Sequence, residues 1–284
     1  MRFGEIRLAL LGCRGMFATD ALPILKAAGF AVYGADLPEL DIADESSVEA
    51  FLGRANPRVI LNAAAFTDVD GAEAKEEEAF SANAKGPEVL ARASARRGAF
   101  LVHISTDYVF KGDNPEGYEP GDNPGPPASV YGRSKLAGER AIAEVLPRER
   151  FLICRTQWLY GTTGKSFPAT ILKLAASRKS LRVVNDQWGV PTWTRELARQ
   201  IVLLLNQGAT GIHHAVNGGG PVTWYDFAKR IVAEARLDCT VEPCTTAEFP
   251  RPAGRPAHAW LRGGPPGAQP WEDGVREYLA ARSQ

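Results

Sequence analysis

The sequence predicts an α/β fold: a doubly wound parallel sheet of the Rossmann type, with a smaller, loop-rich C-terminal part. Helix-like segments separate five short apolar stretches, and strands that alternate with helices form a parallel sheet with right-handed crossovers. The stretches lack polar alternation, which is typical of strands covered on both faces. They are residues 6–12, 31–36, 58–65, 99–106 and 150–156.

The segments between these strands have the features of helices. Residues 44–55 begin with Asp44–Ser47, which can cap a helix, and residues 72–98 are rich in alanine and charge and end at Gly98. After residue 160 the pattern loosens. We therefore predict a dinucleotide-binding domain over residues 1–160 and a mainly substrate-binding part over 161–284, some of which returns to the sheet. Its elements are short strands at 179–184 and 211–217, helices at 194–208 and 223–235, and a proline- and glycine-rich stretch at 248–271.

The composition excludes several classes of protein. Thirty-three basic residues balance thirty-three acidic ones, so net charge favours neither nucleic acid nor a membrane surface as partner. No apolar stretch approaches the ~18 residues of a membrane span, and the apolar stretch at the N-terminus is short for a signal peptide. We expect a cytoplasmic protein without a zinc site or disulfide framework, because the four cysteines lie far apart except for one pair separated by four residues, which has no histidine nearby. They are Cys13, Cys154, Cys239 and Cys244.

A glycine-bearing turn follows the first predicted strand. Gly12 permits a tight turn, Gly15 lets backbone approach a pyrophosphate, and Ala18 is small enough for the next helix to pack on the strand. The free N–H groups of that helix would face the phosphates. A plain strand-to-helix turn is the alternative. Asp36 ends the second strand about 20 residues later, which favours a dinucleotide.

Two residues bear on the choice of cofactor. Asp36 can accept hydrogen bonds from an adenosine ribose and would repel a 2′-phosphate, which favours NAD. Arg14, inside the glycine turn, could pair with that phosphate or could be a solvated loop cation. Both NADH and NADPH therefore stay open.

Tyr131 and Lys135 are spaced to share one face of a predicted helix. An ammonium close to a phenol stabilises the phenolate, so we expect a lowered pKa for Tyr131 and a role in proton transfer. The alternative is a lysine that extends to solvent beside a half-buried tyrosine.

Ser105, Thr106 and Asp107 end the fourth predicted strand with polar groups where a buried strand would continue in valine or isoleucine. In a doubly wound sheet, ligands bind beyond the carboxyl ends of the strands, near the switch in strand order. We expect these residues at that edge, facing Tyr131 and Lys135, where a hydroxyl could polarise a carbonyl. Ser105 could merely satisfy the backbone at the end of the strand.

Eight segments in a fixed order resemble the extended short-chain dehydrogenase/reductases, and within them the RmlD-like reductases. The resemblance covers residues 6–262, and its specificity lies in the combination. The segments are the glycine turn, "NAAAFTDVDGAE", "STDYVFKG", "VYGRSK", "RTQWLYG", "DQWGVPT", "HHAVNGGGPVTWYDFAKRI" and "RPAGRP".

The resemblance implies NAD(P)H-dependent reduction of the C4 keto group of dTDP-4-dehydro-6-deoxy-L-mannose to dTDP-L-rhamnose. Tyr131 would protonate the developing alkoxide, Lys135 would hold the nicotinamide ribose, and Thr106 would help to polarise the carbonyl. The same resemblance implies the substrate contacts. For Trp158 the alternative is packing in the core, and for Arg255 it is a purely structural role. These contacts are Thr106, Asp107, Trp158, Val69 and Arg255.

The family pattern also implies the cofactor contacts. Met16 stands where the family usually has glutamine and Ala18 replaces a third glycine, and the C-terminal tail is shorter than in the family. The pattern allows a magnesium ion near Asp20, although the sequence by itself predicts no metal site. The cofactor contacts are Gly12, Arg14, Gly15, Met16, Phe17, Asp36, Asp41, Ile42, Ala64, Ala65, Thr67, Tyr131 and Lys135.

Two other functions remain open. One is a nucleotide-sugar epimerase, dehydratase or reductase of the same fold. The other is a non-catalytic dinucleotide-binding subunit, like the regulatory subunit of methionine adenosyltransferase. In the favoured case the partner is a nucleotide sugar, and the protein is a monomer or a homodimer.

Overall fold

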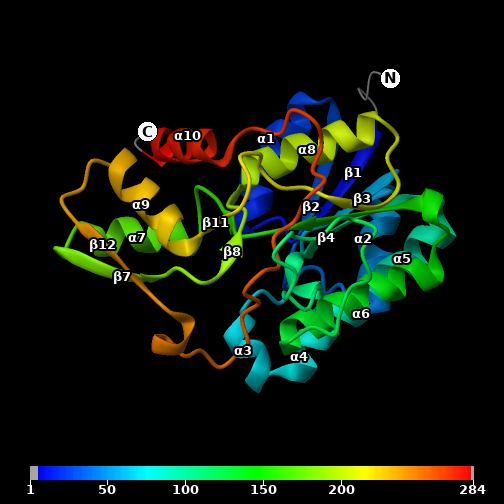
Figure 1. Ribbon diagram of the computed structural model, residues 1–284. Coiled ribbons are helices and arrows are strands. Elements are labelled where there is room, and N and C mark those ends of the chain that lie inside the picture. The colour runs from blue at the N-terminus through cyan, green and yellow to red at the C-terminus, as the bar shows by residue number, and fades with distance from the viewer. Residues whose placement is uncertain (1–5, 283–284) are drawn as a thin grey trace.

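A six-stranded parallel sheet forms the centre of the computed structural model, which describes residues 6–282 (Figure 1). The strand order is β10-β5-β4-β3-β1-β2, and it reverses direction between β1 and β3. All neighbouring strands are parallel, which confirms the doubly wound α/β class. The outermost residues of the two predicted domains, 1–5 and 283–284, lie outside the described residues. The strands are β1 (Ile6–Leu11), β2 (Phe30–Ala35), β3 (Val59–Asn62), β4 (Phe100–Thr106), β5 (Phe151–Thr156) and β10 (Gly211–His214).

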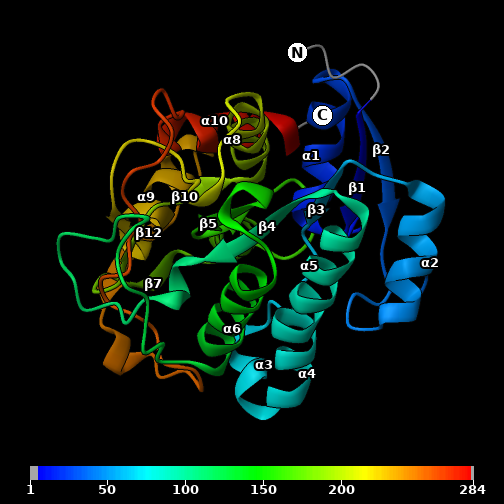
Figure 2. The same cartoon turned by 90° about the vertical axis from the view of Figure 1, so that its right-hand side faces the viewer.

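Helices cover both faces of the sheet, which explains why the strands are apolar throughout. Side chains alternate between the faces of a strand. Ala9 and Leu11 pack with α2 (Glu45–Ala55), α5 (Gly86–Arg97) and α6 (Val130–Val145), which lie on one face. Leu8 and Leu10 pack on the other face, with α1 (Met16–Ala27) and α8 (Thr194–Asn206). Figure 2 shows α5 and α6 running side by side.

The helix predicted over residues 72–98 is divided in the structure. It forms α3 (Val69–Ala74), α4 (Glu76–Phe80), a π-helical turn η1 (Ser81–Lys85) and α5. Pro87 lacks an N–H group and cannot donate to the carbonyl of Asn83, so the regular helical ladder is interrupted there. The carbonyl of Asn83 instead lies against Gly138 of α6, where an added Cβ would be only 2.1 Å away. The other end is as predicted, because Gly98 closes α5 with a φ of 68°.

The rest of the chain builds a second, aromatic core around Trp193, Phe227 and Trp271. Two segments from this half return to the main sheet: β10 pairs with β5, and α8 packs on α1. Residues 249–270 contain only isolated bridges and turns. Within residues 6–282, no helix is long and apolar enough to cross a membrane. The remaining elements are η2 (Asp107–Val109), η3 (Arg148–Arg150), β6 (Leu159–Tyr160), α7 (Phe167–Ala175), β7 (Ser180–Val184), β8 (Trp188–Gly189), β9 (Thr192–Trp193), β11 (Val222–Thr223), α9 (Trp224–Glu234), β12 (Thr240–Cys244), η4 (Thr246–Glu248) and α10 (Trp271–Arg282).

Candidate active site

A cleft of about 1140 Å³ lies at the carboxyl ends of β1, β2, β3, β4 and β5. Parallel strands bring their carboxyl ends to one edge, which is why residues that follow five different strands meet there. The cleft brings together all the residues predicted for the site except Arg255. Its lining includes Gly12, Arg14, Gly15, Met16, Phe17, Asp36, Asp41, Ile42, Ala64, Ala65, Thr67, Val69, Thr106, Asp107, Tyr131, Lys135 and Trp158.

The glycine turn forms one wall of the cleft and suits an anionic ligand. Gly12 has a φ of +77°, and an added Cβ would lie 2.7 Å from the backbone nitrogen of Ala64, so only glycine fits. Helix α1 begins at Met16, and Gly15 before it provides no side-chain cap. The first turn also contains no acidic residue. Its N–H groups are therefore available to a diphosphate.

Asp36 organises the turn beside the glycine loop. Its carboxylate accepts the N–H groups of Arg14 and Leu37, each at 2.9 Å. The guanidinium of Arg14 donates to the carbonyl of Leu37 at 2.6 Å and to Glu39 at 2.7 Å. Arg14 is thus already paired with the carboxylate of Glu39, in the turn that Asp36 organises. Nearby, Asp41 accepts the N–H of Ala43.

The loop after β3 is tied to the helix that carries Tyr131. The amide of Asn83 accepts the N–H of Phe66 at 2.9 Å and donates to the carbonyl of Phe66 at 3.0 Å. It also donates to the hydroxyl of Ser134 on α6, at 3.0 Å. Asn83 therefore sets the distance between the loop with Ala64, Ala65 and Thr67 and the helix.

Tyr131 and Lys135 lie one turn apart on α6, which Ser129 caps by accepting the N–H of Gly132. The predicted lowering of the Tyr131 pKa is wrong for this structure. Desolvation in the cleft raises the pKa of Tyr131, and a hydrogen bond with Thr106 opposes this only partly. The expected lowering requires an ammonium beside the phenol, but Nζ of Lys135 donates to the carbonyl of Ile104, at 2.7 Å. Burial lowers the pKa of Lys135 itself to about 8.

Thr106 and Asp107 form a buried polar cluster with Gln157, a residue that the sequence analysis missed. The hydroxyl of Thr106 donates to Asp107 at 2.9 Å, and the amide of Gln157 donates to the other carboxylate oxygen at 2.7 Å. Burial raises the pKa of Asp107 to about 7. Ser105 does not satisfy the backbone, as was considered, because its buried hydroxyl has no partner among residues 6–282. The buried hydroxyl of Thr156, on the neighbouring strand, also has no hydrogen-bond partner among these residues.

Trp158 stacks on Trp224, with ring centroids 3.5 Å apart and an interplanar angle of 13°. Both indoles line the cleft. Trp158 has a φ of +45°, a strained conformation for a large side chain and one that is often found at functional sites. Trp224 was not predicted. It starts α9 directly after the N-cap Thr223, within the capping box that Thr223 forms with Asp226, and that pattern marks the start of the helix but not its place at the cleft.

Arg255 and Asp20 are held by other groups. Arg255 lies 3.0 Å from the carboxylate of Asp70 and donates to the carbonyl of Ala253, outside the lining of the cleft. Asp20 is buried and accepts hydrogen bonds from Thr162 and from the hydroxyl of Thr194. Among residues 6–282 there is no group of three or more histidines, cysteines or acids that could hold a metal ion.

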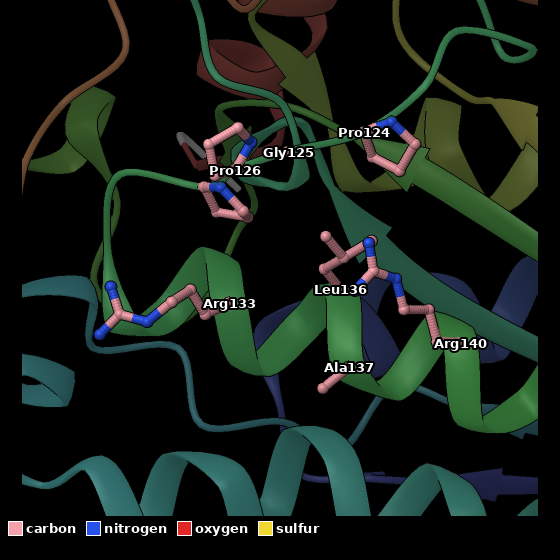
Figure 3. Close-up of a pocket in the computed structure, with 8 residues that line it drawn as sticks. Pro124, Gly125, Pro126, Arg133, Leu136, Ala137 and Arg140 are labelled. Carbon is pink, nitrogen blue, oxygen red and sulfur yellow. The ribbon is translucent and has the colours of Figure 1, made fainter.

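A second, smaller pocket of about 350 Å³ lies between α6 and the proline-rich loop at residues 124–127 (Figure 3). Leu136 and Arg140 extend from the helix toward this loop. Arg133 is the other charged group of its lining. The pocket contains none of the predicted site residues, so the larger cleft is the candidate active site.

Comparisons with known proteins agree with this geometry. A family model described as the RmlD substrate binding domain matches residues 6–282. A dTDP-4-dehydrorhamnose reductase of Mycobacterium tuberculosis is 38% identical, over 97% of this chain and 93% of that protein. A dTDP-4-keto-6-deoxy-D-glucose reductase of Streptomyces niveus is 40% identical, over 78% of this chain and 76% of that protein. The crystal structure of a dTDP-4-dehydrorhamnose reductase from Bacillus anthracis in complex with NADP matches with a TM-score of 0.93 at 35% identity, over 98% of this chain and 99% of that one.

Proposed function

Because the chain belongs to the RmlD substrate-binding domain family, we propose that it is an NAD(P)H-dependent oxidoreductase of nucleotide-sugar biosynthesis. The reaction is reduction of the C4 keto group of dTDP-4-dehydro-6-deoxy-L-mannose, which gives dTDP-L-rhamnose. One observation carries the proposal: Thr106, Tyr131 and Lys135 share a single cleft with the glycine turn. A non-catalytic dinucleotide-binding subunit would have no need of this combination.

The reduction adds a hydride to the carbonyl carbon and a proton to its oxygen. The reduced nicotinamide supplies the hydride when it is bound. Tyr131 donates its phenolic proton to the oxygen as negative charge develops there. Tyr131 is protonated at neutral pH, as a general acid requires, and its raised pKa means that proton transfer depends on the negative charge that develops on the oxygen. The hydroxyl of Thr106, which now donates to Asp107, turns toward the same oxygen and stabilises its charge.

The glycine turn and the uncapped start of α1 would hold the cofactor diphosphate, and Asp36 would hold the adenosine ribose. The pairing of Arg14 with Glu39 leaves no free cation for a 2′-phosphate in the turn as it stands. The side chain of Arg14 is exposed, however, and can exchange its partner. We therefore propose that the protein accepts both NADH and NADPH.

The sugar would lie between Asp107, Val69 and the stacked indoles of Trp158 and Trp224. Aromatic faces pack well on the apolar face of a sugar ring, and a buried carboxylate accepts its hydroxyls. The contact of Arg255 with the nucleotide diphosphate stays a prediction, and it requires this arginine to leave Asp70. We place the loop-rich part after residue 160 over the substrate.

The direct test is to supply dTDP-4-dehydro-L-rhamnose with NADH or NADPH and to follow the absorbance of the reduced cofactor. The D-configured 4-keto-6-deoxyglucose nucleotide, the substrate named for one relative, is assayed in parallel to settle stereochemistry. A Tyr131→Phe protein should still bind cofactor but lose about 100-fold or more of its turnover. Sugar conversion without net oxidation of cofactor would instead indicate an epimerase or dehydratase. A stoichiometric partner without any turnover would indicate a regulatory subunit.

We also propose that the reaction takes place in the cytoplasm and that the protein acts as a monomer or homodimer. Light scattering of the purified protein measures the second point.

A further inference from the structure

Four groups form a continuous buried chain of polar contacts behind the cleft. The N–H of Ala64 donates to Oδ1 of Asn62 at 3.1 Å. Nδ2 of Asn62 lies 3.1 Å from Nδ1 of His103, and Nε2 of His103 lies 3.3 Å from Nζ of Lys135. Asn62 and His103 are each 1% exposed and Lys135 is 2% exposed, so the contacts between these three side chains are shielded from bulk water.

The contacts cannot all be hydrogen bonds while Lys135 is charged. The two ends of the chain, the N–H of Ala64 and an ammonium, are donors only. The amide of Asn62 and the neutral ring of His103 each supply one donor and one acceptor. Three contacts need three acceptors, and the middle pair provides two. One contact must therefore place a donor against a donor, whichever way the amide is turned and whichever ring nitrogen carries the proton.

Loss of one proton from Lys135 removes this conflict. A neutral amine offers a lone pair to the N–H at Nε2 of His103, while one of its own N–H groups still donates to the carbonyl of Ile104, at 2.7 Å. Each of the three contacts then has one donor and one acceptor. Protonation of His103 would make the conflict worse, and burial together with Lys135 indeed holds the pKa of His103 well below its ordinary value.

We propose that Asn62 and His103 are positioning residues that favour the neutral amine of Lys135 in the ligand-free cleft. Neither residue touches the space that the substrate would fill, and both act through Lys135. The inference deepens the proposed function, on which its catalytic meaning rests. A lysine held in this way changes charge when the cleft fills, because a ligand oxygen that accepts a hydrogen bond supplies the missing acceptor.

Other charges around α6 must be weighed against this effect. Glu139, one turn along the same helix, raises the pKa of Lys135, but its carboxylate is held by Arg155 of β5 at 2.7 Å. Among the described residues, only His103 and the carbonyl of Ile104 are hydrogen-bonded to the Lys135 side chain. The remaining titratable groups on α6 are Tyr131, Arg133, Arg140 and Glu144. Those on neighbouring elements that the contacts identify are Glu73, Glu76, Asp107 and Tyr108.

The test is a direct titration of Lys135 in ligand-free protein. Lysine labelled with ¹³C at Cε is followed by NMR from pH 6 to 11, and the Lys135 signal is identified by its loss in Lys135→Met. In Asn62→Asp the extra oxygen accepts from Nδ1 of His103, whose Nε2 then accepts from the ammonium, so all contacts are satisfied with Lys135 charged. We expect the pKa of Lys135 to rise by about one unit or more, and one unit corresponds to ~1.4 kcal/mol.

Asn62→Asp also introduces a negative charge, which could raise the pKa of Lys135 directly. His103→Phe is the control, because it keeps roughly the volume of the ring and adds no charge. If burial alone controlled Lys135, this apolar substitution would leave its pKa unchanged or lower it, whereas the proposal requires a rise. The proton of the His103 ring gives a second readout by ¹⁵N NMR. It should be on Nε2 in the wild-type protein and on Nδ1 in Asn62→Asp.

A Lys135 pKa that does not rise in either variant would overturn the proposal, as would a wild-type His103 that carries its proton on Nδ1. If His103→Phe does not fold, Asn62→Asp and the wild-type ring proton still decide. No substrate is used, so these results stand apart from those of the reductase assay. In an active enzyme, the alkaline limb of the kcat profile should move to higher pH in Asn62→Asp, an effect that a purely structural role would not cause.

Discussion

The substitution Gly189→Ala tests the role assigned to Trp158. Gly189 lies in β8, and an added Cβ would come within 2.3 Å of Cε2 and 2.5 Å of Cζ2 of the Trp158 indole. Carbon atoms in contact are about 3.5–4.0 Å apart, so the indole must move by roughly 1 Å or more. It cannot do so freely, because it is stacked on Trp224 at 3.5 Å.

A displacement of about 1 Å in a group that positions substrate can reduce the rate by about 100-fold. Because Trp158 would provide only part of the sugar contact, we expect kcat/KM for the sugar nucleotide to fall by roughly 10-fold to 100-fold, or about 1.4–2.7 kcal/mol. The KM for the reduced cofactor should stay the same, since the glycine turn is on another wall of the cleft. The assay is the initial rate with each substrate varied in turn.

The matched control is Gly121→Ala, where an added Cβ meets nothing within 4 Å. Near-ultraviolet circular dichroism reports whether the stacked indoles have moved, because two tryptophans so close together couple strongly. If the spectrum changes, the protein stays folded and kcat/KM for the sugar is unaffected, then Trp158 does not hold the sugar and its strained backbone needs another explanation.

Three further outcomes follow from the charges in and behind the cleft. Burial raises the pKa of Asp107 from 3.8 to about 7, so between these values the folded protein holds a proton that the unfolded chain has lost, and wild-type stability falls as pH rises. Asp107→Asn has no carboxyl group and does not lose stability in this way, so the Tm of the variant minus that of the wild type should increase from pH 5 to pH 8. A Tm difference that stays constant over this range would contradict the raised pKa. Glu39→Gln frees the guanidinium of Arg14 and should raise the ratio of kcat/KM for NADPH to that for NADH, whereas an unchanged ratio would show that Arg14 does not reach the 2′-phosphate. Arg155→Met leaves the buried carboxylate of Glu139 unpaired and should cost about 3–5 kcal/mol in urea unfolding, and a loss below about 1 kcal/mol would show that the pair contributes little.

The sheet and the location of the site could be predicted because both follow from local patterns. A strand buried on both faces is apolar at every position, and the carboxyl ends of parallel strands share an edge. The glycine turn before α1 and the one-turn spacing of Tyr131 and Lys135 are also local. These features were enough to bring residues from the first 160 positions into one cleft.

The remainder depends on contacts between distant segments. Burial raises the pKa of Tyr131, and Nζ of Lys135 donates to the carbonyl of Ile104 on a different element rather than to the phenol. The division of the long helix has a local cause in Pro87, but the packing of the Asn83 carbonyl against Gly138 joins two distant segments. Trp224 enters the cleft from α9, whose first residue follows the pairing of β11 with β8. No spacing within a single segment contains this information.

The place of β10 in the sheet has a consequence for how the protein is made. Residues 211–214 form the outermost strand, β10, beside β5. In a nascent chain that ends near residue 160, β10 is missing, so the edge of β5, whose residues are all buried in the complete protein, is exposed. Unpaired strand edges promote aggregation. The sheet can be completed only after His214 has left the ribosome, when most of the loop-rich half is already synthesised. The two halves must therefore mature together, and we expect that a chain cut after residue 160 will be insoluble.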